Sequence, residues 1–249
     1  MKLPFEKNYY IHVIENQERF KFIQTNIDLL NIENCEIKYV TSINPLQTII
    51  GDFLYLSKIM PFWRNCNKGN VLNEFVNLYC LIKIAYLQNI NSICIIEDDI
   101  VFDPSKIELL QDTLNNIPQN WECLRIHTVS NENITNEINN GNLSKNIPQV
   151  LHNWCLYDKY NRNINGTQCF ALKRSAMIKY IHMCEKLCYP IISMNQDTKI
   201  NEITDKKYYN PYYGVNPDEI LNKLTNYCET YICHKLITKS IENNISTMK

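Results

Sequence analysis

Three consecutive carboxylates, Glu97, Asp98 and Asp99, directly follow the apolar run Ile93–Ile96. This run does not alternate and is rich in β-branched residues, which predicts a short strand buried on both faces, as in the middle of a parallel sheet. Side chains alternate along a strand, so Glu97 and Asp99 are expected on one side, roughly 6.6 Å apart, with Asp98 on the other. One divalent cation, or a cation and a ribose, fits that gap.

The electrostatics of this acidic triplet (residues 97–99) favour a ligand. Adjacent carboxylates repel one another, and beside a sheet core their charged forms are poorly solvated, so at least one pKa should rise unless a counter-charge is present. A bound metal removes this penalty, and in open α/β sheets ligands bind beyond the carboxyl ends of the strands. The triplet therefore indicates a metal and nucleotide site, with a solvated acidic turn as the alternative.

Length and composition indicate one domain over residues 1–249, because 249 residues with 45% hydrophobic content can bury a large core. The net charge is −1, and the sequence has no long block of charged residues of one sign. This argues against a nucleic-acid or membrane-surface partner. No apolar run approaches the roughly 20 residues of a membrane span, and residues 1–6 lack a signal-peptide core. The eleven cysteines are scattered, without a Cys-x-x-Cys pair, so we expect reduced thiols in a soluble, cytoplasmic protein.

Apolar periodicity alternates between strand and helix patterns along the chain, which predicts an α/β fold. Strands are predicted at residues 8–14, 37–42, 93–96, 121–126, 166–172 and 230–238. Helices are predicted from Glu18, over 72–86, from Pro104 with Asp103 as N-cap, over 176–187, and from Pro217 with Asn216 as N-cap. A right-handed crossover makes the first two strands parallel. Residues 129–165 are polar and weakly periodic, which indicates a long surface excursion of the kind that forms lids.

Four patches of the sequence stand out by their order and spacing. They are Ile11-His12-Val13 with Glu18-Arg19; the Glu-Asp-Asp of residues 97–99; Gly166, Phe170, Arg174 and Ala176 followed by Asp197; and the strand and Ser of residues 231–240. Together they resemble the pattern of glycosyltransferase family twenty-five, which contains bacterial lipooligosaccharide galactosyltransferases and procollagen galactosyltransferases. Two features depart from the family pattern. Val76-Asn77-Leu78 stands where members carry a Gly-Cys-x-x-Ser-His signature, and His12 replaces the usual Asn.

The resemblance implies a Rossmann-like GT-A nucleotide-sugar-binding sandwich with a mostly parallel central sheet. Residues 8–130 would bind the donor and residues 150–240 would meet the acceptor. The implied reaction moves a hexose, galactose or glucose, from a UDP-sugar to a hydroxyl group on a glycan or protein. It implies Mn²⁺ or Mg²⁺, which suit an all-oxygen carboxylate site. With Asp197 as the base that accepts the hydroxyl proton, the transfer would invert the anomeric centre.

The metal ligands expected from the sequence are Asp99 first, then Glu97, which binds directly, through water or through the ribose. His234 is a third candidate by position, and a strand histidine hydrogen-bonded in the wall is its alternative. Asp98 either holds the sugar or orients its neighbours.

The remaining candidates lie near the ends of predicted strands. Arg19 could face the diphosphate or uracil, or be a solvated residue at a helix start. His12 lines the base pocket or is buried structure. Arg174, with Lys173, touches phosphate or sits at a turn. Loop aromatics could stack on sugar rings, with core packing as the alternative: Trp63, Trp154 and Tyr157.

Two other classes of protein compete with the transferase. A nucleotide-sugar-binding module of the same fold without turnover is the main alternative, because the Ser-His signature is missing. A metal-dependent phosphohydrolase or nuclease is the second, but two-metal sites usually want further acidic or histidine ligands nearby, and the sequence offers only Asp103.

Overall fold

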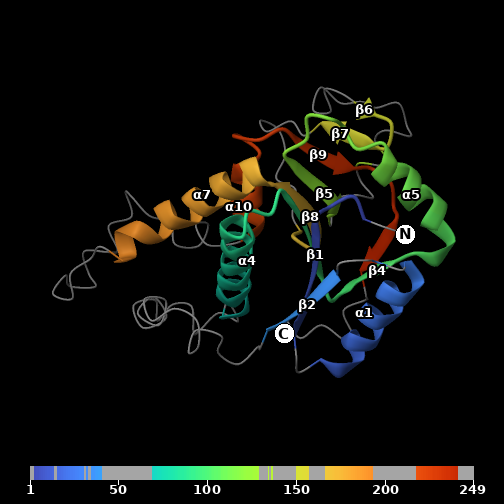
Figure 1. The fold of residues 1–249 in the computed structure, drawn as a ribbon, viewed down its shortest axis with the longest axis horizontal. Helices are drawn as coiled ribbons and strands as arrows, with labels where there is room; N and C mark the ends of the chain where they lie inside the picture. Colours follow the sequence, from blue (N-terminus) through green and yellow to red (C-terminus); the bar gives the residue numbers. More distant parts are fainter. Residues whose placement is uncertain are drawn as a thin grey trace.

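An eight-stranded sheet in the order β2-β1-β3-β8-β5-β9-β7-β6 lies at the centre of the computed structural model (Figure 1). The structure describes residues 3–13, 16–30, 32, 35–40, 69–128, 134, 136, 150–156, 166–192 and 217–240. The strands of this sheet are β1 (Lys7–Val13), β2 (Cys35–Val40), β3 (Ser92–Glu97), β5 (Cys123–His127), β6 (Val150–Leu151), β7 (Trp154–Leu156), β8 (Cys169–Lys173) and β9 (Thr230–Cys233). A second, antiparallel pair joins β4 (Ile100–Phe102) to β10 (Thr238–Ser240).

The helices follow the predicted positions closely. They are α1 (Gln17–Leu30), α4 (Gly69–Leu87), α5 (Ile107–Asn115), α7 (Arg174–Ile192) and α10 (Pro217–Leu224), with a 3₁₀ turn at Pro104–Lys106. Asp103 caps this turn as expected, because its Oδ1 accepts the backbone N–H of Ser105 at 3.1 Å. None of the helices in the described ranges is long and apolar enough to cross a membrane.

The sheet is mixed, and its strand directions decide what meets at each edge. β1 is parallel to β2 and β3, β5 is parallel to β9, and β8 is antiparallel to both β3 and β5. Strands β1, β2, β3, β5 and β9 therefore all end at one edge, which we call the carboxyl edge, and β8 begins there. The predicted α/β class and the parallel β1–β2 crossover are confirmed. The expectation that β3 has only parallel neighbours is corrected by β8.

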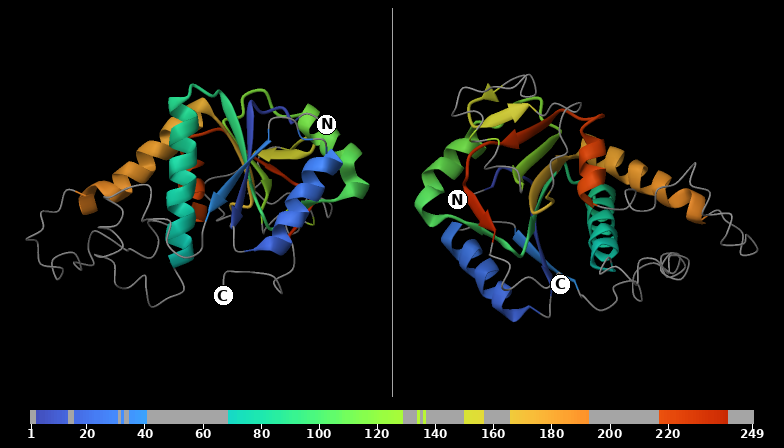
Figure 2. Two further views of the ribbon diagram at one scale, coloured as in Figure 1. Left: turned by 60° about the horizontal axis from the view of Figure 1, so that its bottom comes forward. Right: turned by 180° about the vertical axis from the view of Figure 1, so that it is seen from behind.

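Helices cover both faces of the sheet. Figures 1 and 2 show α4, α7 and α10 on one face, and α1 and α5 on the other. We call these the α4 face and the α1 face. Along β3, Ile93 and Ile95 pack in the core of the α4 face, whereas Cys94 and Ile96 pack in the core of the α1 face. All four side chains are at most 1% exposed, which confirms a strand buried on both faces. Burial of one such side chain stabilises by about 1.5–3 kcal/mol.

Two parts of the chain differ from the sequence expectation. The predicted strand 230–238 is divided, because a tight turn with a hydrogen bond from Ile237 N–H to Lys235 C=O directs the chain from β9 into β10. Part of the predicted surface excursion, residues 150–156, belongs to the sheet. There Trp154 is 0% exposed and donates its indole N–H to Thr113 C=O at 3.0 Å. Of the two roles considered for this residue, stacking on a sugar ring and packing in the core, the structure shows packing in the core.

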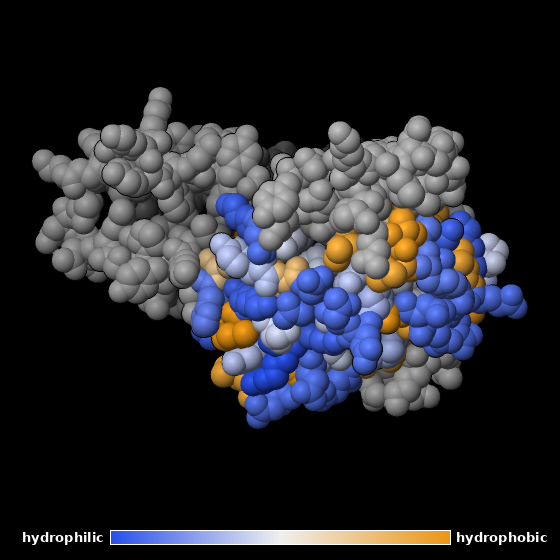
Figure 3. All heavy atoms as spheres, turned by 90° about the horizontal axis from the view of Figure 1, so that it is seen from above, coloured by the Kyte–Doolittle hydropathy of each residue, from blue (hydrophilic) through white to orange (hydrophobic). Residues whose placement is uncertain are grey.

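The described surface on the face seen in Figure 3 is mostly hydrophilic. Figure 3 shows blue atoms over most of the coloured surface, with separate orange patches. The large apolar side chains that are exposed among the described residues are Tyr39, Ile84, Leu87, Tyr227 and Leu236.

Asn26 of α1 fixes the strand that follows the acidic triplet. Its side-chain amide donates to Ile100 C=O at 2.9 Å and accepts the Phe102 N–H at 3.3 Å, and the residue is 1% exposed. The amide thus satisfies backbone groups of β4 on the side away from β10.

Asn26→Ala should lower the free energy of unfolding by about 1–3 kcal/mol, because buried backbone groups of β4 lose their partner. Urea unfolding measures this change. Gln24→Ala is the matched control, since Gln24 bonds Asp28 on the exposed side of the same helix, and its stability should stay that of the wild type. Equal loss in both variants would contradict the role given to Asn26.

Candidate functional site

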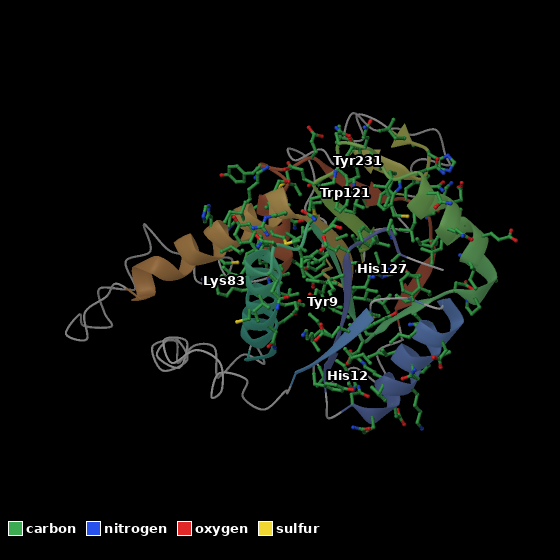
Figure 4. The ribbon with its side chains drawn as sticks, viewed as in Figure 1. Tyr9, His12, Lys83, Trp121, His127 and Tyr231 are labelled. Carbon is green, nitrogen blue, oxygen red and sulfur yellow. The ribbon has the colours of Figure 1, made fainter. Side chains whose placement is uncertain are left out.

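The acidic triplet lies at the carboxyl edge, and its members separate onto different faces of the sheet. Glu97 is the last residue of β3 and continues the α4 face of Ile93 and Ile95. Asp98 contacts residues of β1 and α1 on the other face. Figure 4 shows Tyr9 and His12 along β1, with His12 beside α1 and far from Trp121. The opposite directions predicted for Glu97 and Asp98 are therefore what the structure shows, whereas Asp98 and Asp99 lie in a turn after the strand.

Both carboxylate oxygens of Asp98 are occupied. Oδ2 lies 2.9 Å from His12 Nδ1 and accepts the Val13 N–H at 2.9 Å, while Oδ1 accepts from Arg19 Nη1 at 2.7 Å. Asp98, His12 and Arg19 are 4%, 1% and 5% exposed. The ring of His12 also contacts those of Phe20 and Tyr39. This arrangement ties the turn after β3 to the end of β1 and the first turn of α1.

Glu97 belongs to a second group on the α4 face. Thr167 Oγ1 lies 2.7 Å from Glu97 Oε1 and 2.7 Å from Glu74 Oε1 of α4. The hydroxyl has a single proton and can donate it to one of the two carboxyl groups at a time. Burial and the charges of Asp218 and Asp99 raise the pKa of Glu74 to about 7. Burial and the charges of Glu74 and Asp99 raise the pKa of Glu97 well above its usual range.

Asp99 is the member of the triplet with an unsatisfied oxygen. Its Oδ1 is buried and has no hydrogen-bond partner in the part of the chain that the structure describes. Burial raises the pKa of Asp99, the charge of Arg19 opposes that rise, and Asp98 adds to it. Asp99 also raises the pKa of both Glu74 and Glu97, so these carboxyl groups lie within electrostatic reach of one another. A buried oxygen with no donor is suited to a cation.

A buried arginine organises the chain beside Glu97. Arg125 of β5 is 1% exposed and donates from Nη2 to Gly166 C=O at 2.5 Å and from Nη1 to Asn222 Oδ1 at 3.4 Å. Asp218, in the first turn of α10, accepts the Gly166 N–H at 2.8 Å. Gly166 has φ of 110°, a region that favours glycine. Burial raises the pKa of Asp218, against the opposing effects of the Gly166 N–H and Arg125.

Two of the candidate residues, Arg174 and His234, are not brought to this site. Arg174 lies at the opposite edge, because β8 runs antiparallel and ends there; its guanidinium stacks on the Tyr86 ring at 4.0 Å. His234 follows β9 and is separated from β3 by β8 and β5, a distance of roughly 14 Å across the sheet. Its Nε2 lies 2.9 Å from His152 C=O, and burial lowers its pKa. Asp197, like Trp63 and Tyr157, lies outside the described residues.

Within the described ranges, no three His, Cys, Asp or Glu residues are arranged to hold a metal ion by themselves. Of the predicted ligands, Glu97 and Asp99 lie within electrostatic reach of one another at the end of β3, and His234 lies elsewhere. A cation here would take further ligands from water or from a bound phosphate, as Mg²⁺ commonly does.

Sequence reasoning missed Glu74, Thr167, Arg125 and Asp218. Arg125 carried a signal, because it is a charged residue inside an otherwise apolar strand pattern, and such a residue needs a buried partner. Thr167 adjoins a glycine that the family pattern already marked. Asp218 lies in the first turn of α10 and Glu74 in the second turn of α4, and single acidic residues near the beginning of a helix are common on any surface.

The raised pKa of Glu74 predicts a dependence of stability on pH. A carboxyl whose pKa is about 7 in the folded state and ordinary in the unfolded chain contributes stability at low pH that is lost as the pH rises from about 4.5 through 7. In Glu74→Gln, the fall in unfolding free energy between pH 5 and pH 8 should be smaller by at least about 1 kcal/mol. Urea unfolding in metal-free buffer at both pH values tests this, and an unchanged fall would contradict it.

Comparisons with known proteins give one family and distant structures. The family model of glycosyltransferase family 25 (LPS biosynthesis protein) matches residues 78–200. No curated protein has a significantly similar sequence. A glycosyltransferase involved in the glycosylation of the major capsid of PBCV-1 has TM-score 0.33 and 10% identity, covering 91% of this chain and 92% of that one. Mouse xyloside xylosyltransferase 1, apo form, has TM-score 0.35 and 10% identity, covering 88% of this chain and 68% of that one.

Structural similarities with TM-scores this low do not support a function. The class of reaction is therefore inferred from the family match and from the residues of the site. The matched range includes the acidic triplet, Arg125, Thr167 and Asp197. The resemblance to glycosyltransferase family 25 is thus confirmed over residues 78–200, and glycosyl transfer is the class of reaction that this match supports.

Proposed function

We propose that the protein is a metal-dependent glycosyltransferase that moves a hexose, galactose or glucose, from a UDP-sugar to a hydroxyl group of a glycan or protein. One observation carries the proposal. The acidic triplet stands at the carboxyl edge of the central strand, and Asp99 has a buried oxygen that no donor of the described chain satisfies. Carboxylates in this position match the ligand crevice of open α/β sheets.

The donor set fits a hard divalent cation, Mn²⁺ or Mg²⁺. Asp99 and Glu97 would hold it, with phosphate oxygens and water as the other ligands. When bound, the cation acts as a Lewis acid toward the leaving diphosphate. Asp99 and Glu97 supply negative charge that is poorly compensated within the described chain, which favours a cation at this position.

The other residues position the donor and the acceptor in this proposal. Asp98 orients its neighbours, since both its oxygens are engaged by His12, Arg19 and the Val13 N–H. Through Asp98, His12 and Arg19 hold the end of β1 against the acidic triplet. The donor half is 8–130 and the acceptor half 150–240. Asp197 accepts the proton of the attacking hydroxyl, and a single displacement inverts the anomeric centre.

Asp99→Ala should abolish Mn²⁺-dependent turnover of UDP-galactose and UDP-glucose, with a fall of at least about 100-fold, because the cation loses its first ligand. Sugar release and calorimetric titration of UDP, each with and without Mn²⁺, measure the effect. Glu108→Ala, an exposed carboxylate of α5, is the matched control and should behave as wild type.

Unchanged turnover in Asp99→Ala would contradict the proposal. Metal-dependent binding of UDP by the wild type without sugar release would instead favour the binding module, for which the missing Ser-His signature at residues 76–78 is the supporting observation. The two outcomes differ in the same pair of assays.

Asp197→Asn should lower kcat by about 10²–10⁴-fold, because a general base contributes a factor of this size. The affinity for UDP with Mn²⁺ should stay unchanged, since the base touches only the acceptor hydroxyl. Asp205→Asn changes another aspartate of the same part of the sequence and serves as the control. If kcat fell equally in both variants, Asp197 would not be the base.

A further inference from the structure

Arg125 carries a positive charge in a buried strand, and such a charge requires compensating partners. A buried guanidinium is costly unless its donors are paired. Arg125 donates to the carbonyl of Gly166 and to Asn222, and its charge lowers the pKa of Asp218, so the two groups lie within electrostatic reach of one another. Asp218 accepts the N–H of the same glycine.

Both backbone polar groups of Gly166 are therefore held, one by β5 and one by α10. Its φ of 110° leaves the residue in a conformation that a side chain would strain. These contacts also restrict Thr167. Its backbone has little freedom, because the preceding residue is held by two hydrogen bonds and β8 begins two residues later. The Thr167 hydroxyl therefore lies between Glu97 and Glu74, at 2.7 Å from each.

Thr167 is 5% exposed, and its hydroxyl touches the carboxyl group that would hold the cation. A carboxylate side chain at a strand end has several rotamers, and partners beyond the ligands commonly select the one that binds metal. Loss of such partners typically weakens metal binding by about 10–100-fold.

We propose that Thr167 is a positioning residue for Glu97, and that Arg125 and Asp218 act through Gly166 to place it. This inference rests on the proposed function, because Glu97 is there a ligand of the cation. α10 is then more than a covering helix. It contributes Asp218 and Asn222, which hold the start of β8 in place from the α4 face.

A matched pair of variants tests the role of the hydroxyl. Thr167→Val keeps the shape of the side chain and removes the hydroxyl, whereas Thr167→Ser keeps it. Thr167→Val should weaken Mn²⁺ binding about 10–100-fold, measured by calorimetry, and Thr167→Ser should retain the wild-type affinity. Asp218→Asn keeps an acceptor for the Gly166 N–H but removes the charge facing Arg125, so its affinity should lie between them.

A control variant separates positioning from general stability. Lys179 of α7 bonds Glu122 at 2.9 and 3.0 Å at the opposite edge of the sheet. Lys179→Met should lower the urea midpoint without changing Mn²⁺ affinity. If Mn²⁺ affinity fell in Lys179→Met as much as in Thr167→Val, the effect would come from loss of stability and the inference would be wrong.

A second measurement needs no metal. In protein labelled with ¹³C at the glutamate carboxyl groups, the resonance of Glu97 is assigned by its loss in Glu97→Gln. It should shift in metal-free Thr167→Val and stay in place in Thr167→Ser.

The two measurements distinguish failure of the inference about Thr167 from failure of the proposed function. Wild-type Mn²⁺ affinity or an unshifted Glu97 resonance in Thr167→Val overturns the inference even if the enzyme is a metal-dependent transferase. If the wild type binds no Mn²⁺, the proposed function fails, and the resonance alone decides whether Thr167 positions Glu97.

Discussion

The structure around β3 depends on how negative charge is accommodated where a fully buried strand ends. Each carboxyl group of the triplet meets this constraint differently. Asp98 is neutralised by Arg19 and held by two further donors. Glu97 shares the Thr167 hydroxyl with Glu74, and burial raises the pKa of both carboxyl groups. Asp99 has a buried oxygen without a hydrogen-bond partner among the described residues. Only the last two leave charge that an external cation would relieve, so one short segment combines a structural anchor with a ligand position.

Because β8 is antiparallel to its neighbours, the site is formed both by residues where strands end and by residues where a strand begins. Parallel strands deliver their carboxyl ends to the site, as β1, β3 and β5 do. β8 delivers its beginning instead, and with it Gly166 and Thr167. α4 and α10 start at the same edge, which brings Glu74 and Asp218 to the α4 face. Glu74 of α4, Asp218 of α10 and Thr167, just before β8, thus act on Glu97 although they are far apart in sequence.

The sequence sufficed for features that depend on neighbouring residues. The burial of Ile93–Ile96 and the opposite directions of Glu97 and Asp98 follow from the period of a strand. Contacts that depend on strand order could not be predicted in this way. Asp98 meets Arg19 across 79 positions of sequence, and only the pairing of β1 with β3 makes that contact possible. For Arg174, which follows a predicted strand, the sequence allows contact with phosphate or a place at a turn, and it does not show that this strand ends at the other edge of the sheet. Asp197 remains a prediction.

The two apolar layers have strands in common. Alternate side chains of β1, β3, β5 and β8 enter the core beneath α4, α7 and α10, and the others enter the core beneath α1 and α5. Neither layer can unfold while the other stays packed, because both use the same strand backbones. The two layers are therefore expected to unfold as one cooperative unit. A destabilising substitution in a helix far from the acidic residues then affects them by lowering the fraction of molecules that are folded.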